Sequence, residues 1–195
     1  MTFARALRSF LRQDPDVILV GEIRDLETAQ ISAQASLTGH LVLSTLHTND
    51  APSAIARLLD LGLEPFLVTA TLEAIIAQRL VRRICTNCKT PYRPTDDQLW
   101  ELRLKAEDLG DKQFFYGKGC DYCNNTGYRG RMGLYEIMVL DDGLRDMIME
   151  NASTAVLRRE AIKRGMRVLR ESGLTAIYNG VTTIDEIVRE TILEE

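Results

Sequence analysis

The 195-residue sequence lacks the features that mark membrane, secreted and nucleic-acid-binding proteins. No apolar run approaches the roughly 20 residues of a membrane-spanning helix, and no signal peptide precedes the fold. Lys and Arg (24) do not outnumber Asp and Glu (28), so the net charge of −4 does not favour a nucleic-acid-binding protein. The content of 45% hydrophobic and 27% charged residues is that of a globular protein. We expect a cytoplasmic protein, in which the four cysteines are more typical of thiols or metal ligands than of disulfides.

Residues 17–46 predict a strand, a helix and a second strand. The apolar run Val17–Val20 is typical of a strand buried on both faces of a parallel sheet. A helical pattern over 26–37 follows, and a second apolar run, Leu41–Leu46, ends at His47. Such a βαβ unit implies a parallel pair joined by a right-handed crossover. Glu22 and His47 are therefore expected at the carboxyl ends of the two strands, where open α/β sheets bind ligands.

These two side chains suit a reaction at a phosphate. A carboxylate just beyond a buried strand is held by a rigid element, where it can orient a metal-bound water or accept a proton. The alternative is that Glu22 is the first polar residue of an exposed turn. Both histidines of the chain, His40 and His47, flank the second strand, although a lone histidine is more often structural. Thr48 adds a hydroxyl group at the same edge.

The wording of these segments resembles a known family. LRQDPDVILVGEIRD and TGHLVLSTLHTND are similar to the Walker B and histidine boxes of the secretion ATPase superfamily, the hexameric motors of type II secretion and type IV pilus assembly. The resemblance continues through AQRLVRRICTNC and GCDYCNNTGYRGRMGLYEI to the C-terminus. It implies an α/β fold, the second half of a RecA-like P-loop ATPase core. It also implies that Glu22 is the Walker B catalytic glutamate, that His47 lies near the terminal phosphate, and that Thr48 joins them in nucleotide binding.

The resemblance also implies cofactors, partners and a location. ATP and Mg²⁺ would bind the complete enzyme, which would be a homo-hexamer working with the inner-membrane platform proteins of the secretion or pilus machine. The location would be the cytoplasm, peripheral to the inner membrane. Secretion and pilus assembly both stay open.

One part of the family pattern is missing. The sequence has no G-x-x-x-x-G-K-[ST] phosphate loop, and its one Gly-Lys pair, Gly117-Lys118, continues with Gly119 and Cys120. We therefore expect the C-terminal part of a larger ATPase, inactive alone, with Met1 either a native start or a truncation point.

Two Cys-x-x-Cys pairs form the second chemical feature. Cys85 and Cys88 are separated from Cys120 and Cys123 by 31 residues, which leaves room for a helix and a strand. Four thiolates in two such pairs suit a closed, tetrahedral, structural zinc site. Two disulfides and unligated cysteines are the alternatives.

The sequence predicts three segments: residues 1–84 as the half ATPase core, 85–140 as a zinc-binding tetracysteine subdomain with a strand over Leu134–Val139, and 141–195 as a small helical bundle. Further helices are expected over about 51–61, 65–80 and 95–110, the last with a Thr95–Gln98 capping box. The final helix, containing Ile192, is expected to begin with a Thr183–Glu186 capping box.

Two surface features leave a rival function open. Arg129 and Arg131 are either solvated or meet a neighbouring subunit or a partner. A basic stripe on the helical end is either a solvated face or a partner site, and comprises Arg158, Arg159, Lys163, Arg164, Arg167 and Arg170. The rival is a non-catalytic zinc-knuckle interaction or nucleic-acid-binding module, with bases stacked on Phe114, Phe115, Tyr116, Tyr122 and Tyr128. The acidic balance counts against nucleic acid.

Overall fold

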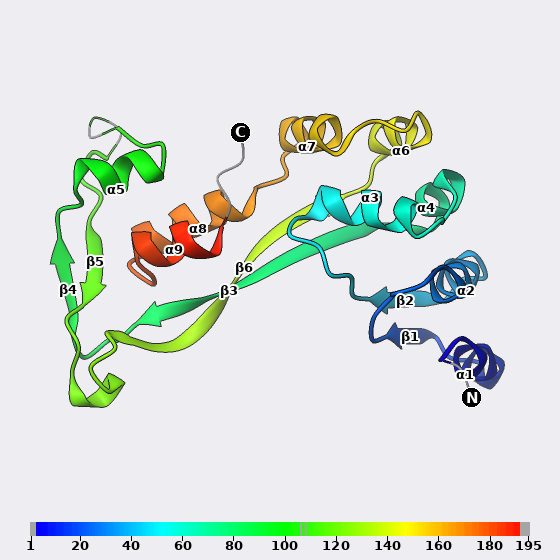
Figure 1. Cartoon of the computed structure of the whole chain (residues 1–195), viewed down its shortest axis with the longest axis horizontal. Helices are drawn as coiled ribbons and strands as arrows, with labels where there is room; N and C mark the ends of the chain where they lie inside the picture. Colours follow the sequence, from blue (N-terminus) through cyan, green and yellow to red (C-terminus); the bar gives the residue numbers. More distant parts are fainter. Residues whose placement is uncertain (1–2, 106, 108, 192–195) are drawn as a thin grey trace. The chain divides into compact units, whose positions relative to one another are not determined.

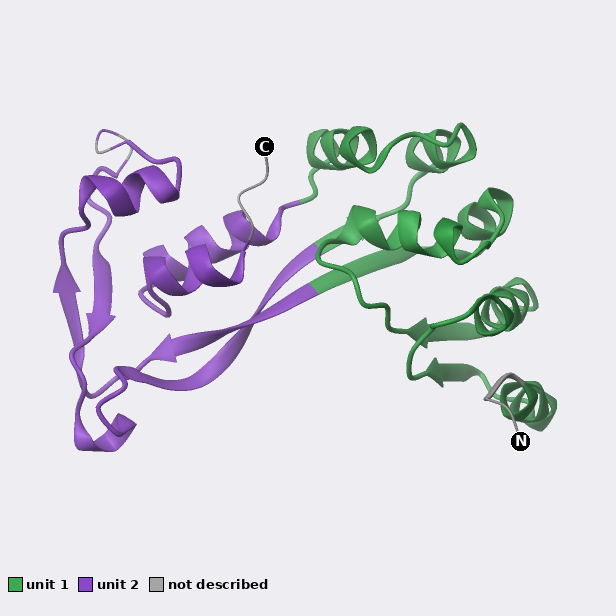
Figure 2. Ribbon diagram, viewed as in Figure 1, with its two compact units in different colours: residues 1–77, 137–166 green, residues 78–136, 167–195 purple. Residues whose placement is uncertain are grey.

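The computed structural model describes residues 3–105, 107 and 109–191 (Figure 1). The chain forms two compact units (Figure 2). Unit 1 consists of residues 1–77 and 137–166, and unit 2 of residues 78–136 and 167–195. Each unit therefore combines two stretches of chain, whereas the three predicted segments, 1–84, 85–140 and 141–195, follow one another. That division into three functional segments stays a prediction.

Unit 1 contains the predicted strand, helix and strand. The two strands β1 (Val17–Val20) and β2 (Leu41–Ser44) are parallel, with Val17 opposite Leu41 and Val20 opposite Ser44. The crossover between them is helix α2 (Leu26–Leu37), as the sequence predicts. The second strand ends two residues earlier than expected. The other elements of this unit are α1 (Phe3–Phe10), η1 (Leu11–Gln13), α3 (Ala51–Asp60), α4 (Pro65–Thr71), α6 (Asp142–Met149) and α7 (Thr154–Lys163).

Aspartate side chains begin the helices that follow the two strands. Asp25 Oδ1 accepts a hydrogen bond from Thr28 N at 2.8 Å at the start of α2, and Asp50 Oδ1 accepts one from Ser53 N at 2.8 Å at the start of α3. Gly39 follows α2 with a φ of 97°, a left-handed conformation that favours glycine. The helix boundaries next to the strands are thus fixed by local chemistry.

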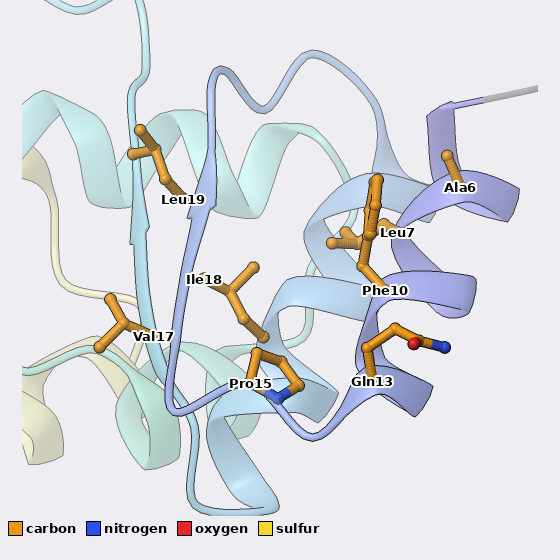
Figure 3. A pocket seen from close by; sticks show the side chains of 8 residues that line it. All are labelled: Ala6, Leu7, Phe10, Gln13, Pro15, Val17, Ile18 and Leu19. Atoms are coloured by element: carbon orange, nitrogen blue, oxygen red, sulfur yellow. The ribbon is translucent and has the colours of Figure 1, made fainter.

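The expectation that β1 is buried on both faces is wrong for the described chain. Ile18 and Val20 pack against Leu7 of α1 and Ile31 of α2, but Val17 and Leu19 are 56% and 73% exposed. The strand alternates because helices cover only one face of this two-stranded sheet. An apolar cavity of about 320 Å³ lies beside β1, lined mainly by residues of α1 and β1 (Figure 3).

Unit 2 is built on two pairs of strands. Strands β3 (Ala74–Ile84) and β6 (Tyr128–Val139) form one two-stranded sheet, and residues 74–77 and 137–139 of these strands are assigned to unit 1. Strands β4 (Lys89–Tyr92) and β5 (Phe114–Gly117) form an antiparallel pair. The helical elements of this unit are α5 (Asp96–Glu101), η3 (Asp121–Cys123), α8 (Leu169–Tyr178) and α9 (Ile184–Glu190). Strand β6 contains the predicted strand over 134–139 and begins six residues earlier.

The predicted helix over 65–80 is wrong in its second half. Helix α4 ends at Thr71, and Leu72 has the extended backbone angles φ −90° and ψ 120°. The chain then enters β3, in which Ile75, Ile76 and Val81 are β-branched residues suited to a sheet. Pairing with β6 therefore overrides apolar spacing that also fits a helix.

The predicted helix over 95–110 is also shorter than expected. The Thr95–Gln98 capping box forms as predicted, but α5 ends at Glu101. Arg103 follows with a φ of 55°, which no helix continues through. Ala106, part of the predicted helix, lies outside the described residues.

Only half of the predicted Thr183–Glu186 capping box forms. Thr183 Oγ1 accepts from Glu186 N at 3.2 Å, but the Glu186 carboxylate binds Arg82 of β3 instead. It accepts from Arg82 N at 2.9 Å and from Arg82 Nη2 at 2.7 Å, and Glu186 is 1% exposed. The predicted helix member Ile192 lies outside the described residues.

Contacts with Arg82 and, at 2.6 Å, with Arg189 determine the ionisation of Glu186. Burial alone would raise the pKa of this carboxyl, but the Arg82 side chain and backbone N–H hold the pKa below its ordinary value of 4.5. Because the folded-state pKa is the lower one, the stabilisation is present above pH 4.5 and is lost as the pH falls below that value.

We predict that Glu186→Gln lowers the free energy of unfolding at pH 7 by about 1.5 kcal/mol. The effect is at the low end for a charged hydrogen bond because the Arg82 side chain is 41% exposed and screened by water. Urea unfolding at pH 7 and pH 3.5 is the measurement, and the difference from wild type should shrink at the lower pH. Glu190→Gln is the control, and equal effects of the two variants at pH 7 would contradict the prediction.

We predict that the chain self-associates through the open face of β1 and β2, because Leu19 and Leu43 are 73% and 50% exposed there. The double variant Leu19→Lys, Leu43→Lys should remain monomeric at concentrations where wild type associates. Sedimentation velocity measures this. Trp100→Lys, at a 77% exposed site in unit 2, is the control and should associate like wild type. Association of the double variant at wild-type concentrations would refute the prediction.

Candidate functional site

Glu22 and His47 meet at the carboxyl ends of β1 and β2. Glu22 Oε1 contacts His47 Nε2, and Glu22 Oε2 accepts a hydrogen bond from Arg24 Nε. The glutamate side chain is 20% exposed, whereas that of His47 is 86% exposed. The sheet thus brings together two of the residues selected from the sequence, with the carboxylate sheltered and the imidazole open to solvent.

Hydrogen bonds to backbone carbonyls continue the strand pairing into the site. Ile23 N donates to Thr45 O at 3.1 Å, and Thr45 Oγ1 donates to Gly21 O at 2.6 Å. These bonds lie on either side of Glu22, so the segments after both strands stay in register. Thr48, the third predicted nucleotide-binding residue, lies one residue beyond His47, where its N–H donates to Leu46 O at 3.2 Å.

His40 is not part of this site. Its Nδ1 lies 2.9 Å from Ala35 O and 3.0 Å from Thr38 Oγ1, at the C-terminal end of α2. His40 precedes β2, and His47 follows it. The imidazole of His40 therefore closes a helix end, which is the structural reading that the sequence left open.

Two contacts near the site were not predicted from the sequence, although Arg158 was named as part of the basic stripe. Arg24 binds Glu22 from two positions along the chain, a spacing that has no recognised signal in a loop. Arg158 of α7 forms an ion pair with Asp50 at 3.0 Å, and no sequence pattern links residues so far apart.

The basic stripe is divided by these contacts. Within unit 1, Arg158 binds Asp50, and Arg164 binds Asp141 and, at 3.1 Å, Glu160. In unit 2, Arg170 donates to Glu101 O and Thr191 O, both at 3.3 Å. Much of the predicted stripe is thus used in internal contacts.

The four cysteines gather into one cluster. The Sγ atoms of Cys85, Cys88, Cys120 and Cys123 all lie within 4.8 Å of one another, and none forms a disulfide. Three of the Sγ pairs are separated by 3.7–3.9 Å. A tetrahedral zinc with Zn–S bonds of about 2.3 Å places its sulfurs about 3.8 Å apart. The cluster fits zinc in both number and spacing of donors.

Next to the cysteines, two backbone segments approach each other so closely at Gly117 and Gly127 that neither position has room for a side chain. A Cβ on Gly117 would lie 2.0 Å from Gly127 O, and Gly127 itself has a φ of 77°. The two cysteine loops are joined there by hydrogen bonds from Cys85 N to Gly127 O (2.9 Å) and from Lys118 N to Cys88 O (3.1 Å). The glycines therefore allow the loops to meet and bring the cysteines together.

The cluster contains thiols with opposite tendencies to ionise. Burial raises the pKa of Cys88 to about 12. Burial opposes ionisation of Cys123 too, but N–H donors from Cys120 and Gly127, each 3.3 Å from its Sγ, lower the pKa of Cys123 to about 6. These amide donors favour the thiolate form that a metal requires.

The aromatic side chains near the cysteines are mostly engaged. Phe114 is buried and packs edge-on against Tyr178, with ring centroids 6.0 Å apart. Arg82 stacks over Tyr128 at 4.0 Å, and Arg129 stacks over Tyr122 at 3.8 Å. Packing thus accounts for residues that the rival hypothesis would use to stack on bases.

Across the described ranges, no helix combines the length and apolar character needed to cross a membrane.

Sequence comparison relates nearly the whole chain to secretion and pilus proteins. The family model described as type II/IV secretion system protein matches residues 1–189. The type IV pilus assembly ATPase PilB of Myxococcus xanthus is 53% identical over 98% of this chain and 34% of its own length. The type II secretion system ATPase E of Vibrio cholerae is 47% identical over 98% of this chain and 37% of its own length. The chain thus spans about a third of the length of these curated relatives.

Solved structures share the fold. The pilus retraction motor PilT with bound ADP has a TM-score of 0.66 and 27% identity, over 97% of this chain and 43% of that one. The Legionella pneumophila ATPase DotB has a TM-score of 0.64 at 22% identity, over 95% of this chain and 41% of that one, and supports the fold alone. On the match over residues 1–189 and the close relatives, this chain belongs to the type II/IV secretion system protein family.

Proposed function

We propose that this chain is the part of an ATP-hydrolysing motor for type II secretion or type IV pilus assembly that carries the catalytic Glu22 and His47. The observation that supports it best is the contact between Glu22 and His47 at the carboxyl edge of β1 and β2. Relatives of this chain are named as ATPases of pilus assembly and of type II secretion. These names support a motor function and do not distinguish between the two machines.

In this proposal each residue has a separate task. The sheltered carboxylate of Glu22 acts on the attacking water or on the magnesium shell. The exposed imidazole of His47 reaches the terminal phosphate, and Thr48 contributes a hydroxyl group. A phosphate loop is also needed to bind Mg²⁺ and the phosphates of ATP, and these 195 residues lack that loop.

We base the proposed assembly and location on the family to which the chain belongs. We propose a RecA-like core completed in a homo-hexamer, working in the cytoplasm at the inner membrane with the platform proteins of the secretion or pilus machine. Relatives named as ATPases of pilus assembly and of type II secretion support a role in such a machine.

We further propose that the four cysteines hold one structural zinc ion. Four thiolate donors would leave no open coordination position, so the ion would be structural and would supply no catalytic water. Because this part of unit 2 has short strands and a short helix, the ion would stabilise a region with a small core.

The zinc proposal predicts one tightly bound zinc per chain. Elemental analysis of the purified chain measures it, and absence of metal with four freely titratable thiols would disprove the site.

Replacing Cys85 by Ser should increase amide hydrogen exchange over about residues 85–128, because a ligand is lost, while β1 and β2 keep wild-type exchange. Thr86→Ser, which changes a residue of the same loop that is not a cysteine, is the matched control and should leave exchange unchanged.

The ATPase proposal predicts that Glu22→Gln in the complete enzyme keeps ATP binding and loses turnover by about a hundred- to ten-thousand-fold. The amide is nearly isosteric but is not a base. His47→Ala should also reduce turnover. Phosphate release and binding of an ATP analogue are measured together, and near-wild-type turnover in the Gln variant would refute the role of Glu22.

Two controls sharpen this test. Glu27→Gln, on the first turn of α2, removes a carboxylate outside the site and should leave turnover unchanged. The 195 residues alone should neither bind ATP with useful affinity nor release phosphate, since the phosphate loop is missing. Micromolar binding with sustained turnover by the chain alone would contradict the assignment of tasks.

A further inference from the structure

The loop that carries His47 and Thr48 is held at its far end by a helix distant in sequence. This loop runs from the end of β2 to Asp50, the residue that begins α3. Asp50 Oδ2 lies 3.0 Å from Nη2 of Arg158 on α7. Asp50 Oδ1 accepts from Ser53 N at 2.8 Å. Each carboxylate oxygen therefore has its own partner, one inside α3 and one on another helix.

The ion pair lies in a sheltered place. The side chains of Arg158 and Asp50 are 18% and 13% exposed, so water screens their attraction less than at a surface pair. Helices α3 and α7 also pack against each other, which keeps the two ends of the pair together. A charge-assisted hydrogen bond in such a setting is among the stronger polar contacts.

The neighbouring arginine on α6 has a different task. Arg145 donates to Thr69 O and, at 3.2 Å, binds Glu73, so it fastens the end of α4. Its contacts do not involve the His47 loop. Loss of Arg145 therefore weakens the packing of α6 without touching Asp50.

We propose that Arg158 is a positioning residue that acts through Asp50 to hold His47 and Thr48 in place for the terminal phosphate. The inference rests on the proposed ATPase function. Small displacements of a group that must meet a reacting atom cost large factors in rate, so a slack loop would slow turnover while leaving most of the binding energy for ATP intact. A helix that follows the zinc-binding region in the chain thereby becomes part of the support for the site.

The ion pair can be separated from the helix cap. Asp50→Asn keeps an oxygen that can cap α3, since Asn and Asp are equivalent at this position, but it removes the charge that binds Arg158. Arg158→Gln removes the charge from the other side, and Arg158→Lys restores it. Arg145→Gln on α6 and the exposed neighbour Arg159→Gln on α7 are the matched controls.

The first measurement is amide hydrogen exchange of residues 45–53 in the 195-residue chain. Arg158→Gln and Asp50→Asn should each speed exchange there by about tenfold, and the double variant should be no faster than either single variant. Arg158→Lys should recover most of the protection, and the two control variants should resemble wild type in this segment. Wild-type exchange in Arg158→Gln, or additive effects in the double variant, would overturn the proposal.

The second measurement is turnover in the complete ATPase. Arg158→Gln should lower kcat about tenfold and change KM for ATP by less than twofold, with rescue by Arg158→Lys. An equal fall in kcat for Arg145→Gln would mean that general packing is responsible and would overturn the positioning role. If Glu22→Gln retains turnover, the ATPase proposal fails, whereas the exchange measurement still decides whether Arg158 holds the loop.

Discussion

Parallel pairing of two four-residue strands is the constraint on which the candidate site depends. Hydrogen bonds before and after the pair, from Leu41 N to Asp16 O and from Ile23 N to Thr45 O, both at 3.1 Å, extend the register beyond the strands. With the register fixed, Glu22 and His47 must leave the sheet at the same edge. The helices contribute by covering one face of the pair and by anchoring the loop that follows β2.

Local signals predicted the βαβ unit over residues 17–46 and a capping box, and failed where distant partners decide the outcome. The Thr95–Gln98 capping box forms as predicted because its hydrogen bonds lie within one helical turn. Residues 74–80, by contrast, have an apolar spacing that fits either a helix or a strand, and only β6, more than forty residues later, selects the strand. Glu186 shows the same limit, because its carboxylate turns to Arg82 in place of its own helix end.

The site was predictable to the same extent. The meeting of Glu22 and His47 followed from the βαβ pattern, because that pattern places both residues at the carboxyl ends of the strands. The sequence did not decide the role of His40, because a histidine beside a strand suits either the site or the end of the preceding helix, where it contacts Ala35 and Thr38. The cysteine cluster was predictable from spacing alone, whereas the close approach of Gly117 and Gly127 required the folded backbone.

The four clustered thiols also affect the charge of the protein. The net charge of −4 counts the cysteines as neutral. A zinc ion with four thiolates carries a charge of about −2, so the zinc-loaded chain would carry about −6. The two amide donors to Cys123 place positive dipole ends against that charge, yet they do not remove it. With this added negative charge, the region would repel acidic surfaces more strongly than its composition indicates. The zinc-loaded chain should also elute later than the zinc-free chain from an anion exchanger.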